Sequence, residues 1–214
     1  MEARHTEHQP PEAGSRETTA RNLRMVLALA ALFILPVAGS FWLYYGASWR
    51  PAGHVNHGEL IEPARPLPAV SLPAVSLAGS PDRPLVPNVF TRKWALVYVG
   101  DGGCDRACQY ALYVMRQTWL ALNTDTARVE RVFLSTADCC DTTRLSREHP
   151  GLIVLDASVS SGGKLLEEFP RADRGSMIFV VDPLGNLMMR YDPRRDPKGL
   201  LLDLRRLLRL SHIG

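Results

Sequence analysis

The longest run of apolar positions in the chain lies close to its N-terminus. Residues 25–45 carry no charged side chain, and a polar leader precedes them. At a rise of about 1.5 Å per residue, a helix of this length crosses the roughly 30 Å hydrocarbon layer of a bilayer. Aromatic side chains gather at the C-terminal end of the run, as they do at membrane–water interfaces. The pattern therefore predicts one transmembrane helix over residues 23–46, kinked at Pro36.

The charges that flank this helix predict its orientation. Arg16, Arg21 and Arg24 precede it, whereas Arg50 stands nearly alone after it. Because basic residues stay on the cytoplasmic side, we expect residues 1–22 to form a disordered cytoplasmic tail. The rest of the chain is then expected in the periplasm or another extracytoplasmic space, anchored by a single pass to the inner (cytoplasmic) membrane.

The competing interpretation of the same segment is a cleaved signal peptide. Residues 38–40, Ala-Gly-Ser, would supply the small-residue cleavage site. The apolar run continues through bulky aromatic residues, however, and the polar leader is long for a signal peptide. An uncleaved anchor is therefore favoured.

After the anchor, residues 47–84 are predicted to form a tether and an N-terminal extension. Gly and Pro are frequent up to residue 66, and the sequence Pro-Ala-Val-Ser-Leu then occurs twice, at 68–72 and 73–77. Because the repeat length is odd, the second copy would present opposite faces of a strand from the first. We therefore expect at most one copy to be a well-packed strand and the other to be spacer.

From residue 85 to residue 214, apolar runs and helical periodicities alternate. Predicted strands cover residues 94–99, 129–135, 152–155, 177–181 and 187–191, and predicted helices cover 106–122, 163–169 and the C-terminal stretch capped by Asp196. The first strand, helix and second strand require a parallel pair with a right-handed crossover, and the last two strands form a hairpin. This order predicts an α/β thioredoxin-like fold, a central mixed sheet flanked by helices.

Composition narrows the classes of function. The 25 basic and 22 acidic residues interleave and leave a net charge of +3. A nucleic-acid binder gathers its basic side chains on one face, so no nucleic-acid partner is expected. The sequence contains no phosphate-binding loop, zinc-finger spacing or Ser/His/Asp constellation. Four cysteines remain, as the close pairs Cys104/Cys108 and Cys139/Cys140. Such close pairs are typical of redox or metal sites.

The Cys104/Cys108 pair is the principal candidate site because of its position. Cys104 follows a buried strand and a Gly-Gly turn, and a helix opens just after it. Free N–H groups and the helix dipole stabilise a thiolate there, and Arg106 adds a positive charge. Cys108 lies one helical turn further on, so both sulfurs can share one side. The spacing suits either a reversible disulfide or capture of Cu(I) by two thiolates. The alternative is that Cys108 only fills the helix's apolar face.

The remaining candidates are weaker. Neighbouring residues on a strand point opposite ways, so Cys139 and Cys140 are expected to be separate thiols, with a resolving thiol or an extra copper ligand as the functional alternative. Their loop should reach the same sheet edge as Cys104. His149 is a weak candidate for a third metal ligand. Other residues weighed for a metal were given ordinary roles: His54, His57 and His212 as solvated histidines, Met115 as core, and Met188 and Met189 as hairpin residues.

Residues 94–108, 132–136 and 179–186 together resemble the Sco/SenC family. Asp138-Cys-Cys-Asp-Thr142 lies where that family often has Asp-Pro-x-x-Asp-Thr, and the C-terminal segment is similar to membrane proteins encoded among oxidase assembly genes. The resemblance implies a membrane-anchored thioredoxin fold that delivers copper to the copper site of cytochrome c oxidase or reduces its thiols. It also implies that Cys104 and Cys108 are the copper or redox cysteines.

The sequence departs from the family at three places. Prolines usually flank the family's cysteine pair, and none flanks Cys104 or Cys108. The family's third copper ligand is a histidine just before the hairpin, and residues 171–176 contain none. Ordinary thioredoxins place a cis-proline before the same strand, whereas the nearest proline here, Pro170, lies too early. The shared motif therefore supplies two thiolates at most.

These observations lead to one leading hypothesis and two alternatives. The leading hypothesis is a Sco-like assembly factor for a respiratory cytochrome oxidase, which handles Cu(I) through Cys104 and Cys108. Its expected partners are the membrane and an oxidase subunit or another assembly factor. The first alternative is a thiol–disulfide oxidoreductase that keeps partner cysteines reduced. The second is a non-catalytic scaffold protein with a thioredoxin fold.

Overall fold

The computed structural model describes residues 14–46, 56–77, 83–211 and 213. Two units make up the chain, Met1–Gly53 and His54–Gly214. The first unit contains one helix, α1 (Gly14–Tyr45), whose stretch Arg21–Tyr45 is long and apolar enough to cross a membrane by length and composition. The helix begins before the predicted span and includes residues 14–22, which were predicted to belong to the disordered tail.

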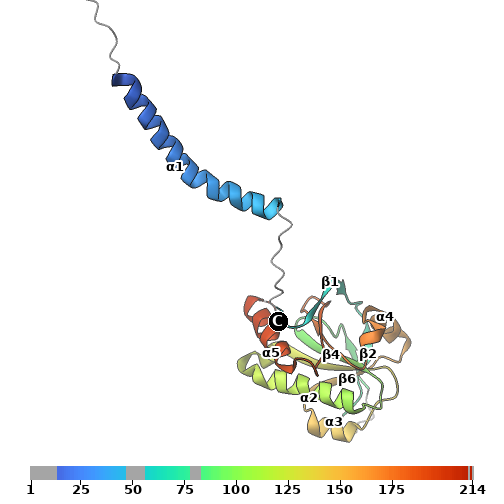
Figure 1. Cartoon of the computed structure of the whole chain (residues 1–214). Helices are drawn as coiled ribbons and strands as arrows, with labels where there is room; N and C mark the ends of the chain where they lie inside the picture. Colours follow the sequence, from blue (N-terminus) through green and yellow to red (C-terminus); the bar gives the residue numbers. More distant parts are fainter. Residues whose placement is uncertain (1–13, 47–55, 78–82, 212, 214) are drawn as a thin grey trace, which may run out of the picture. The chain divides into compact units, whose positions relative to one another are not determined.

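Pro36 interrupts the hydrogen bonding inside α1. Proline has no N–H, so one carbonyl in the preceding turn loses its donor. One turn later, the hydroxyl of Ser40 donates a hydrogen bond of 2.8 Å to the Pro36 carbonyl oxygen. Serine bonds of this kind accompany bends in helices. Figure 1 shows that α1 is bent rather than straight.

A mixed sheet of six strands forms the centre of the second unit (Figure 1). Its strands are β1 (Glu59–Pro66), β4 (Trp94–Gly100), β5 (Val129–Ser135), β6 (Leu152–Asp156), β7 (Ile178–Val181) and β8 (Asn186–Tyr191). Their order is β1-β8-β7-β4-β5-β6, in which β4, β5 and β6 are parallel and the other neighbours antiparallel. The predicted parallel unit and the hairpin of β7 and β8 are both confirmed.

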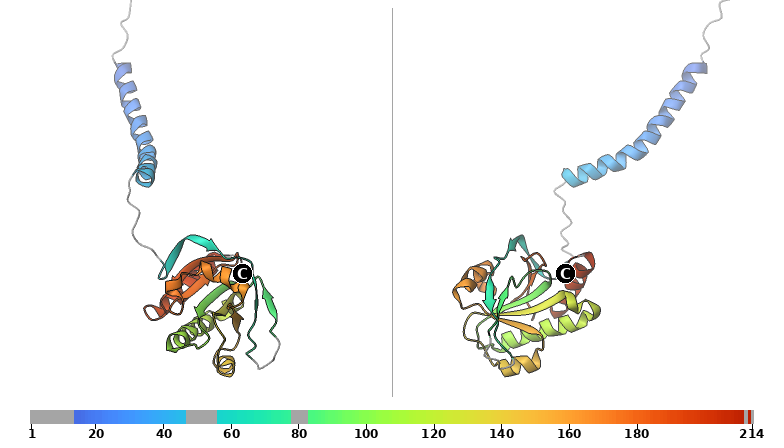
Figure 2. Two further views of the ribbon diagram at one scale, coloured as in Figure 1. Left: turned by 90° about the vertical axis from the view of Figure 1, so that its right-hand side faces the viewer. Right: turned by 180° about the vertical axis from the view of Figure 1, so that it is seen from behind.

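Helices cover both faces of this sheet. They are α2 (Arg106–Ala121), α3 (Thr142–Glu148), α4 (Ser160–Glu168) and α5 (Pro197–Leu210). From residue 94 to 99, the even-numbered residues of β4 pack with α2, α3 and α5, and the odd-numbered residues pack with α4. The views in Figure 2 show these layers from two further sides. A strand that is apolar at every position therefore has a core on each face, as predicted.

β1 lies within residues 47–84, the predicted tether and N-terminal extension, and was not predicted as a strand. Residues 59–66 pair with β8 and form one edge of the main sheet. The hydrophobic pattern of residues 59–66 does not indicate a strand. Most of the side chains are exposed, and Pro63 and Pro66 lie within the segment. Prolines are tolerated in edge strands, where their missing N–H faces away from the neighbouring strand.

Both copies of the tandem repeat pack, which corrects the expectation of a spacer. The first copy contributes Leu72 of β2 (Ser71–Pro73), which pairs with β3 (Leu85–Pro87) and is fully buried in the core on the α4 side. The second copy hydrogen-bonds to β6 through Val75 N–H and the Val154 carbonyl oxygen, at 2.8 Å. Its Val75 and Leu77 pack against the core on the α2 side. The odd repeat length thus produces the predicted reversal of faces.

The short helix α3 was not predicted from the sequence. Asp141 is its N-cap, and the carboxylate accepts a 2.9 Å hydrogen bond from the backbone N–H of Arg144. The helix that Asp141 caps has only one buried apolar residue, Leu145. A helix this short has too little apolar periodicity to stand out in a sequence.

Candidate functional site

The Cys104/Cys108 pair lies between the end of β4 and the start of α2, at the predicted strand–helix junction. The structure joins the two sulfurs as a disulfide, and the two Cα atoms lie 5.0 Å apart. Cys104 has a φ of +40°, a conformation that few residues other than glycine adopt. Both side chains are inside the protein, since Cys104 is 7% and Cys108 3% exposed.

Asp105, between the two cysteines, is a site residue that the sequence analysis missed. It is the N-cap of α2, and its carboxylate accepts a 3.0 Å hydrogen bond from the backbone N–H of Cys108. The pKa of Tyr98 is raised to about 12, first by burial and then by the negative charges of Asp105 and Asp101. These carboxylates oppose the thiolate stabilisation expected from the helix dipole. The sequence did contain a signal for this N-cap, because an acidic residue stands just before the predicted helix.

The second cysteine pair lies in the loop that follows β5. The structure joins the sulfurs of Cys139 and Cys140 too, so the expectation of two separate thiols is wrong. The prediction assumed an extended strand, in which neighbours point apart, whereas Cys140 has a φ of +125°. Both cysteines are only partly buried, and they pack against the core that contains Cys104 and Cys108.

Gly102 sets the distance between the two cysteine loops. It is buried in the turn before Cys104, and a Cβ atom there would overlap the carbonyl group of Asp138. A glycine at this position lets the two backbones touch. The turn before Cys104 therefore lies directly against the segment that leads into Cys139.

A small cavity of about 60 Å³ brings residues from both loops together. Its walls include Cys104 from the first pair, Cys140 from the second pair, and His149 from the end of α3. Cys108 and Cys139 are not among the lining residues. No group of three or more His, Cys, Asp or Glu side chains close enough to hold a metal ion occurs among the residues that the structure describes.

His149 is a buried wall residue of this cavity. It is 6% exposed, and its ring atom Nδ1 has no hydrogen-bond partner. Burial first, and then the charge of Arg131, lower the pKa of His149 below its ordinary value of 6.5. The ring is therefore neutral at neutral pH, which is the form that coordinates metals.

A chain of hydrogen bonds links the Cys104 turn to α3. The side-chain amide of Gln109 donates to the Cys104 carbonyl oxygen at 3.0 Å. Arg144 in turn donates to the Gln109 side-chain oxygen at 3.1 Å, and its guanidinium also binds Glu148 at 3.1 Å. These contacts fix the wall of the cavity that α3 provides. Nothing in the sequence signalled the contact between Arg144 and Gln109, because these residues are far apart along the chain.

Residues 94–211 match the family described as transmembrane-like, thioredoxin-like, C-terminal domain. The chain belongs to this family. The matched segment begins at β4 and ends just after α5, so it contains both cysteine pairs. No curated protein matches the sequence of this family member significantly.

Solved structures of Sco proteins share the fold of this thioredoxin-like family member. Apo Sco1 from Thermus thermophilus is 21% identical, with a TM-score of 0.56 over 73% of this chain and 99% of that one. Copper-bound yeast Sco1 is 14% identical, with a TM-score of 0.55 over 69% and 96%. Copper-bound ScoI from Arabidopsis thaliana is 16% identical, with a TM-score of 0.51 over 67% and 99%. The fold expected from the Sco/SenC resemblance is therefore confirmed.

The segment where a Sco-like histidine was sought has a different role in this thioredoxin-like domain. Asp173 forms an ion pair with Arg190 of β8. The backbone of Gly175 donates to the Val99 carbonyl oxygen at 2.7 Å and accepts a 2.7 Å hydrogen bond from the Tyr98 hydroxyl. Residues 171–176 thus tie the end of β4 to the hairpin, and they contain no histidine.

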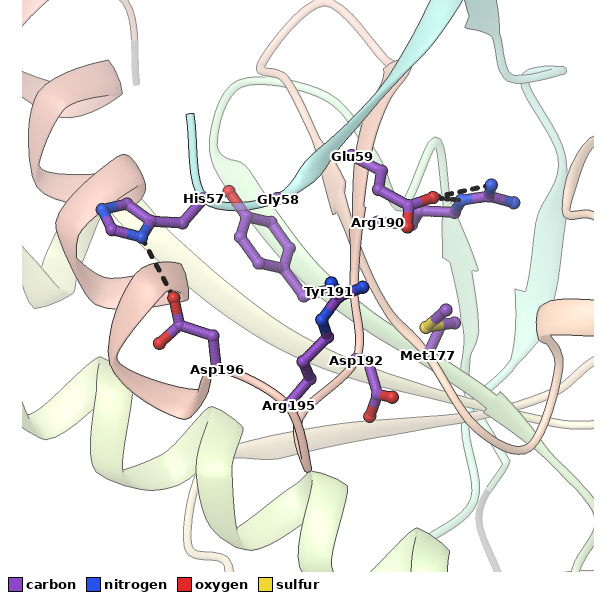
Figure 3. A pocket seen from close by; sticks show the side chains of 9 residues that line it. All are labelled: His57, Gly58, Glu59, Met177, Arg190, Tyr191, Asp192, Arg195 and Asp196. Carbon is purple, nitrogen blue, oxygen red and sulfur yellow. Dashed lines mark hydrogen bonds and ion pairs between the residues drawn. The ribbon is translucent and has the colours of Figure 1, made fainter. Parts of the chain in front are cut away.

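His57 lies in another cavity, well separated in sequence from the cysteines. Figure 3 shows this cavity, of about 300 Å³, between the start of β1, the end of β8 and the start of α5. His57 Nδ1 lies 3.0 Å from a carboxylate oxygen of Asp196. Met115 is fully buried, and Met188 and Met189 lie in β8, as predicted. His54 and His212 lie outside the described residues.

Proposed function

We propose that the chain is a membrane-anchored, Sco-like assembly factor for a respiratory cytochrome oxidase. Its cargo is Cu(I), held between the sulfurs of Cys104 and Cys108 and passed to an oxidase subunit or another assembly factor. The observation that carries the proposal is the position of this pair, at the start of α2 on a Sco-like fold. Soft thiolate ligands at this spacing suit Cu(I).

His149 supplies the third ligand in this proposal. The shared motif lacks the expected histidine, but His149 lines the same cavity as Cys104. Its Nδ1 atom is buried without a partner, so binding a metal would relieve the cost of an unsatisfied polar atom. Its lowered pKa keeps a lone pair available at neutral pH. Coordination through both Cys104 and His149 requires the cavity to contract around the ion.

The same proposal places the thioredoxin-like unit outside the cytoplasm. The arginines before residue 25 and the sparse positive charge after residue 45 support this orientation. A periplasmic or equivalent location also provides the oxidising surroundings in which disulfides persist. The inner membrane then holds the domain beside membrane-bound oxidase subunits.

A thiol–disulfide oxidoreductase is the second candidate, favoured by one observation. Cys104 and Cys108 form a disulfide across one helical turn, which is the oxidised half of a dithiol couple. In this function the reduced pair would reduce a disulfide in the copper site of a partner. Copper handling and thiol reduction both require Cys104 and Cys108 in the reduced state.

Anaerobic titration of the reduced, detergent-solubilised full chain with Cu(I) tests copper handling. Against a chromophoric Cu(I) chelator, we expect one ion to bind per chain. Binding should disappear in Cys104→Ala/Cys108→Ala and weaken about tenfold or more in His149→Gln. Cys139→Ser/Cys140→Ser is the matched control and should bind as the wild type does. Absence of chelator-resistant binding in the wild type would overturn the proposal, and oxidase assembly that survives the double alanine variant would favour a scaffold.

A further inference from the structure

The proposed copper site does not include the Cys139/Cys140 pair, whose exposure to solvent differs from that of the first pair. Cys104 and Cys108 are almost completely buried, whereas Cys139 and Cys140 are partly exposed. Thiol–disulfide exchange requires that the attacking sulfur reach the disulfide along its axis, so access governs its rate. An external reductant therefore meets the second pair more readily than the first.

The two pairs are also in position to exchange with each other. Gly102 allows the backbone before Cys104 to touch the backbone before Cys139. Cys104 and Cys140, one from each pair, line the same cavity, and Arg144 adds a positive charge to its wall beside the acidic Asp141 and Glu148. The cavity that the two cysteines share is small, about 60 Å³.

We propose that Cys139 and Cys140 form a second redox centre that reduces the Cys104–Cys108 disulfide from within the molecule. This inference rests on the proposed function, because both copper handling and thiol reduction begin with reduced Cys104 and Cys108. The electron source is an external dithiol, either a reducing protein or a small molecule, that acts on the partly exposed Cys139–Cys140 disulfide and is itself oxidised to a disulfide.

The exchange proceeds in two steps. The Cys140 thiolate attacks the sulfur of Cys104, so a Cys104–Cys140 bond forms, the Cys104–Cys108 bond breaks, and Cys108 leaves as a thiolate that takes up a proton. The Cys139 thiolate then attacks the sulfur of Cys140, which forms the Cys139–Cys140 bond and releases Cys104 as a thiolate that takes up the second proton. The two protons are those that Cys139 and Cys140 lose when they ionise. Two electrons and two protons have moved from the second pair to the first.

The mixed disulfide between Cys104 and Cys140 is the diagnostic species. To trap it, we would prepare the full chain in detergent with the substitutions Cys108→Ser/Cys139→Ser. This variant keeps only Cys104 and Cys140, the two cavity cysteines. The matched control carries Cys104→Ser/Cys140→Ser, which leaves Cys108 and Cys139. After reduction and brief treatment with diamide, free thiols are alkylated and counted by intact mass. We expect a disulfide within one chain in the first variant and two free thiols in the control.

Reduction kinetics provide a second measurement that does not depend on those variants. Wild-type protein is treated with a limiting dithiol, and cysteines are alkylated at intervals and mapped by peptide mass. We expect the exposed pair to be reduced first in the wild type, and Cys104–Cys108 to be reduced about tenfold more slowly in Cys139→Ser/Cys140→Ser. Equal crosslinking in both double variants, or an unchanged rate, would overturn the relay. Failure of Cu(I) binding with an intact relay would instead overturn copper handling alone.

Discussion

The backbone position of Cys104 and the charge of the neighbouring Asp105 have different effects on the chemistry of its sulfur. Its left-handed backbone and its place before α2 direct the residue toward the cavity, where Cys140 and His149 also lie. The adjacent Asp105 carboxylate stabilises α2 as its N-cap, but its charge disfavours a second negative charge on a nearby sulfur. A cysteine in this setting is better matched to a soft metal or to a neighbouring disulfide than to indiscriminate attack on external disulfides.

The first prediction concerns His149 and pH. Folding lowers the pKa of His149. As the pH falls through about 6.5, His149 therefore takes up a proton in the unfolded chain before it does so in the folded chain. The stability contributed by neutral His149 is therefore present above that pH and is lost below it. We expect the free energy of unfolding to fall between pH 7.5 and pH 5, and to fall less in His149→Gln.

Urea unfolding of the detergent-solubilised chain, followed by tryptophan fluorescence at each pH, measures this difference. Thr143→Ala, an exposed change on the same helix, serves as the control and should keep the wild-type slope. Identical pH profiles for His149→Gln and the wild type would contradict the prediction.

Elements with a long apolar pattern were predicted from the sequence, and elements without one were not. β4, β5, the hairpin and α5 each bury a regular stripe or a continuous run, which fixes both their type and their face. β1 and α3 bury few side chains and are held mainly by pairing and capping. Their positions depend on partners far away in the chain, which local patterns do not encode.

The second prediction concerns the turn between β4 and α2. Gly102→Ala would place a methyl group against the Asp138 carbonyl, so the two loops would have to separate. We expect a loss of about 1–3 kcal/mol in the free energy of unfolding. Gly103→Ala is the matched control, because a Cβ atom there meets its nearest neighbour, a carboxylate oxygen of Asp101, at 3.6 Å.

Chemical unfolding of both variants gives the comparison. The separation of the loops should also reduce the Cys104–Cys140 crosslink in the Cys108→Ser/Cys139→Ser background. Equal stability of the two alanine variants would show that the contact between the loops is dispensable.

For the whole molecule, the fold and the position of the Cys104/Cys108 pair before α2 could be predicted, but the residues that surround the pair could not. The junction of a buried strand with a helix identified the first pair, since that geometry is local. The approach of Cys140 and His149 depends on how the loop after β5 and the short α3 pack across the edge of the sheet. A single sequence indicates that both loops reach this edge, but it does not give their separation.

The third prediction concerns the start of the second unit. Asp203 of α5 is buried, and one of its oxygens accepts hydrogen bonds from the N–H groups of His57 and Gly58 and from the Tyr191 hydroxyl, at 2.7, 3.0 and 2.8 Å. Burial and the Asp203 carboxylate raise the pKa of Tyr191 well above its usual range, so it remains a donor. Asp203→Ala leaves three donors without this acceptor, at a cost of about 1–3 kcal/mol for each buried one.

We therefore expect Asp203→Ala to lower the urea midpoint and to speed hydrogen exchange in residues 57–62. Exposed Glu167→Ala should match the wild type in both measurements. An unchanged exchange rate in Asp203→Ala would mean that β1 is held by its pairing with β8 alone.

The tandem repeat has a consequence for the outer strands of the main sheet. β6 is an outer strand of the main sheet, and an unpaired outer strand is a template for another copy of the chain. The second copy of the repeat occupies that position through Ala74 and Val75. At the opposite side of the sheet, Pro63 and Pro66 interrupt the hydrogen-bonding row of β1. The duplication thus protects against aggregation at one border of the sheet, and proline does so at the other.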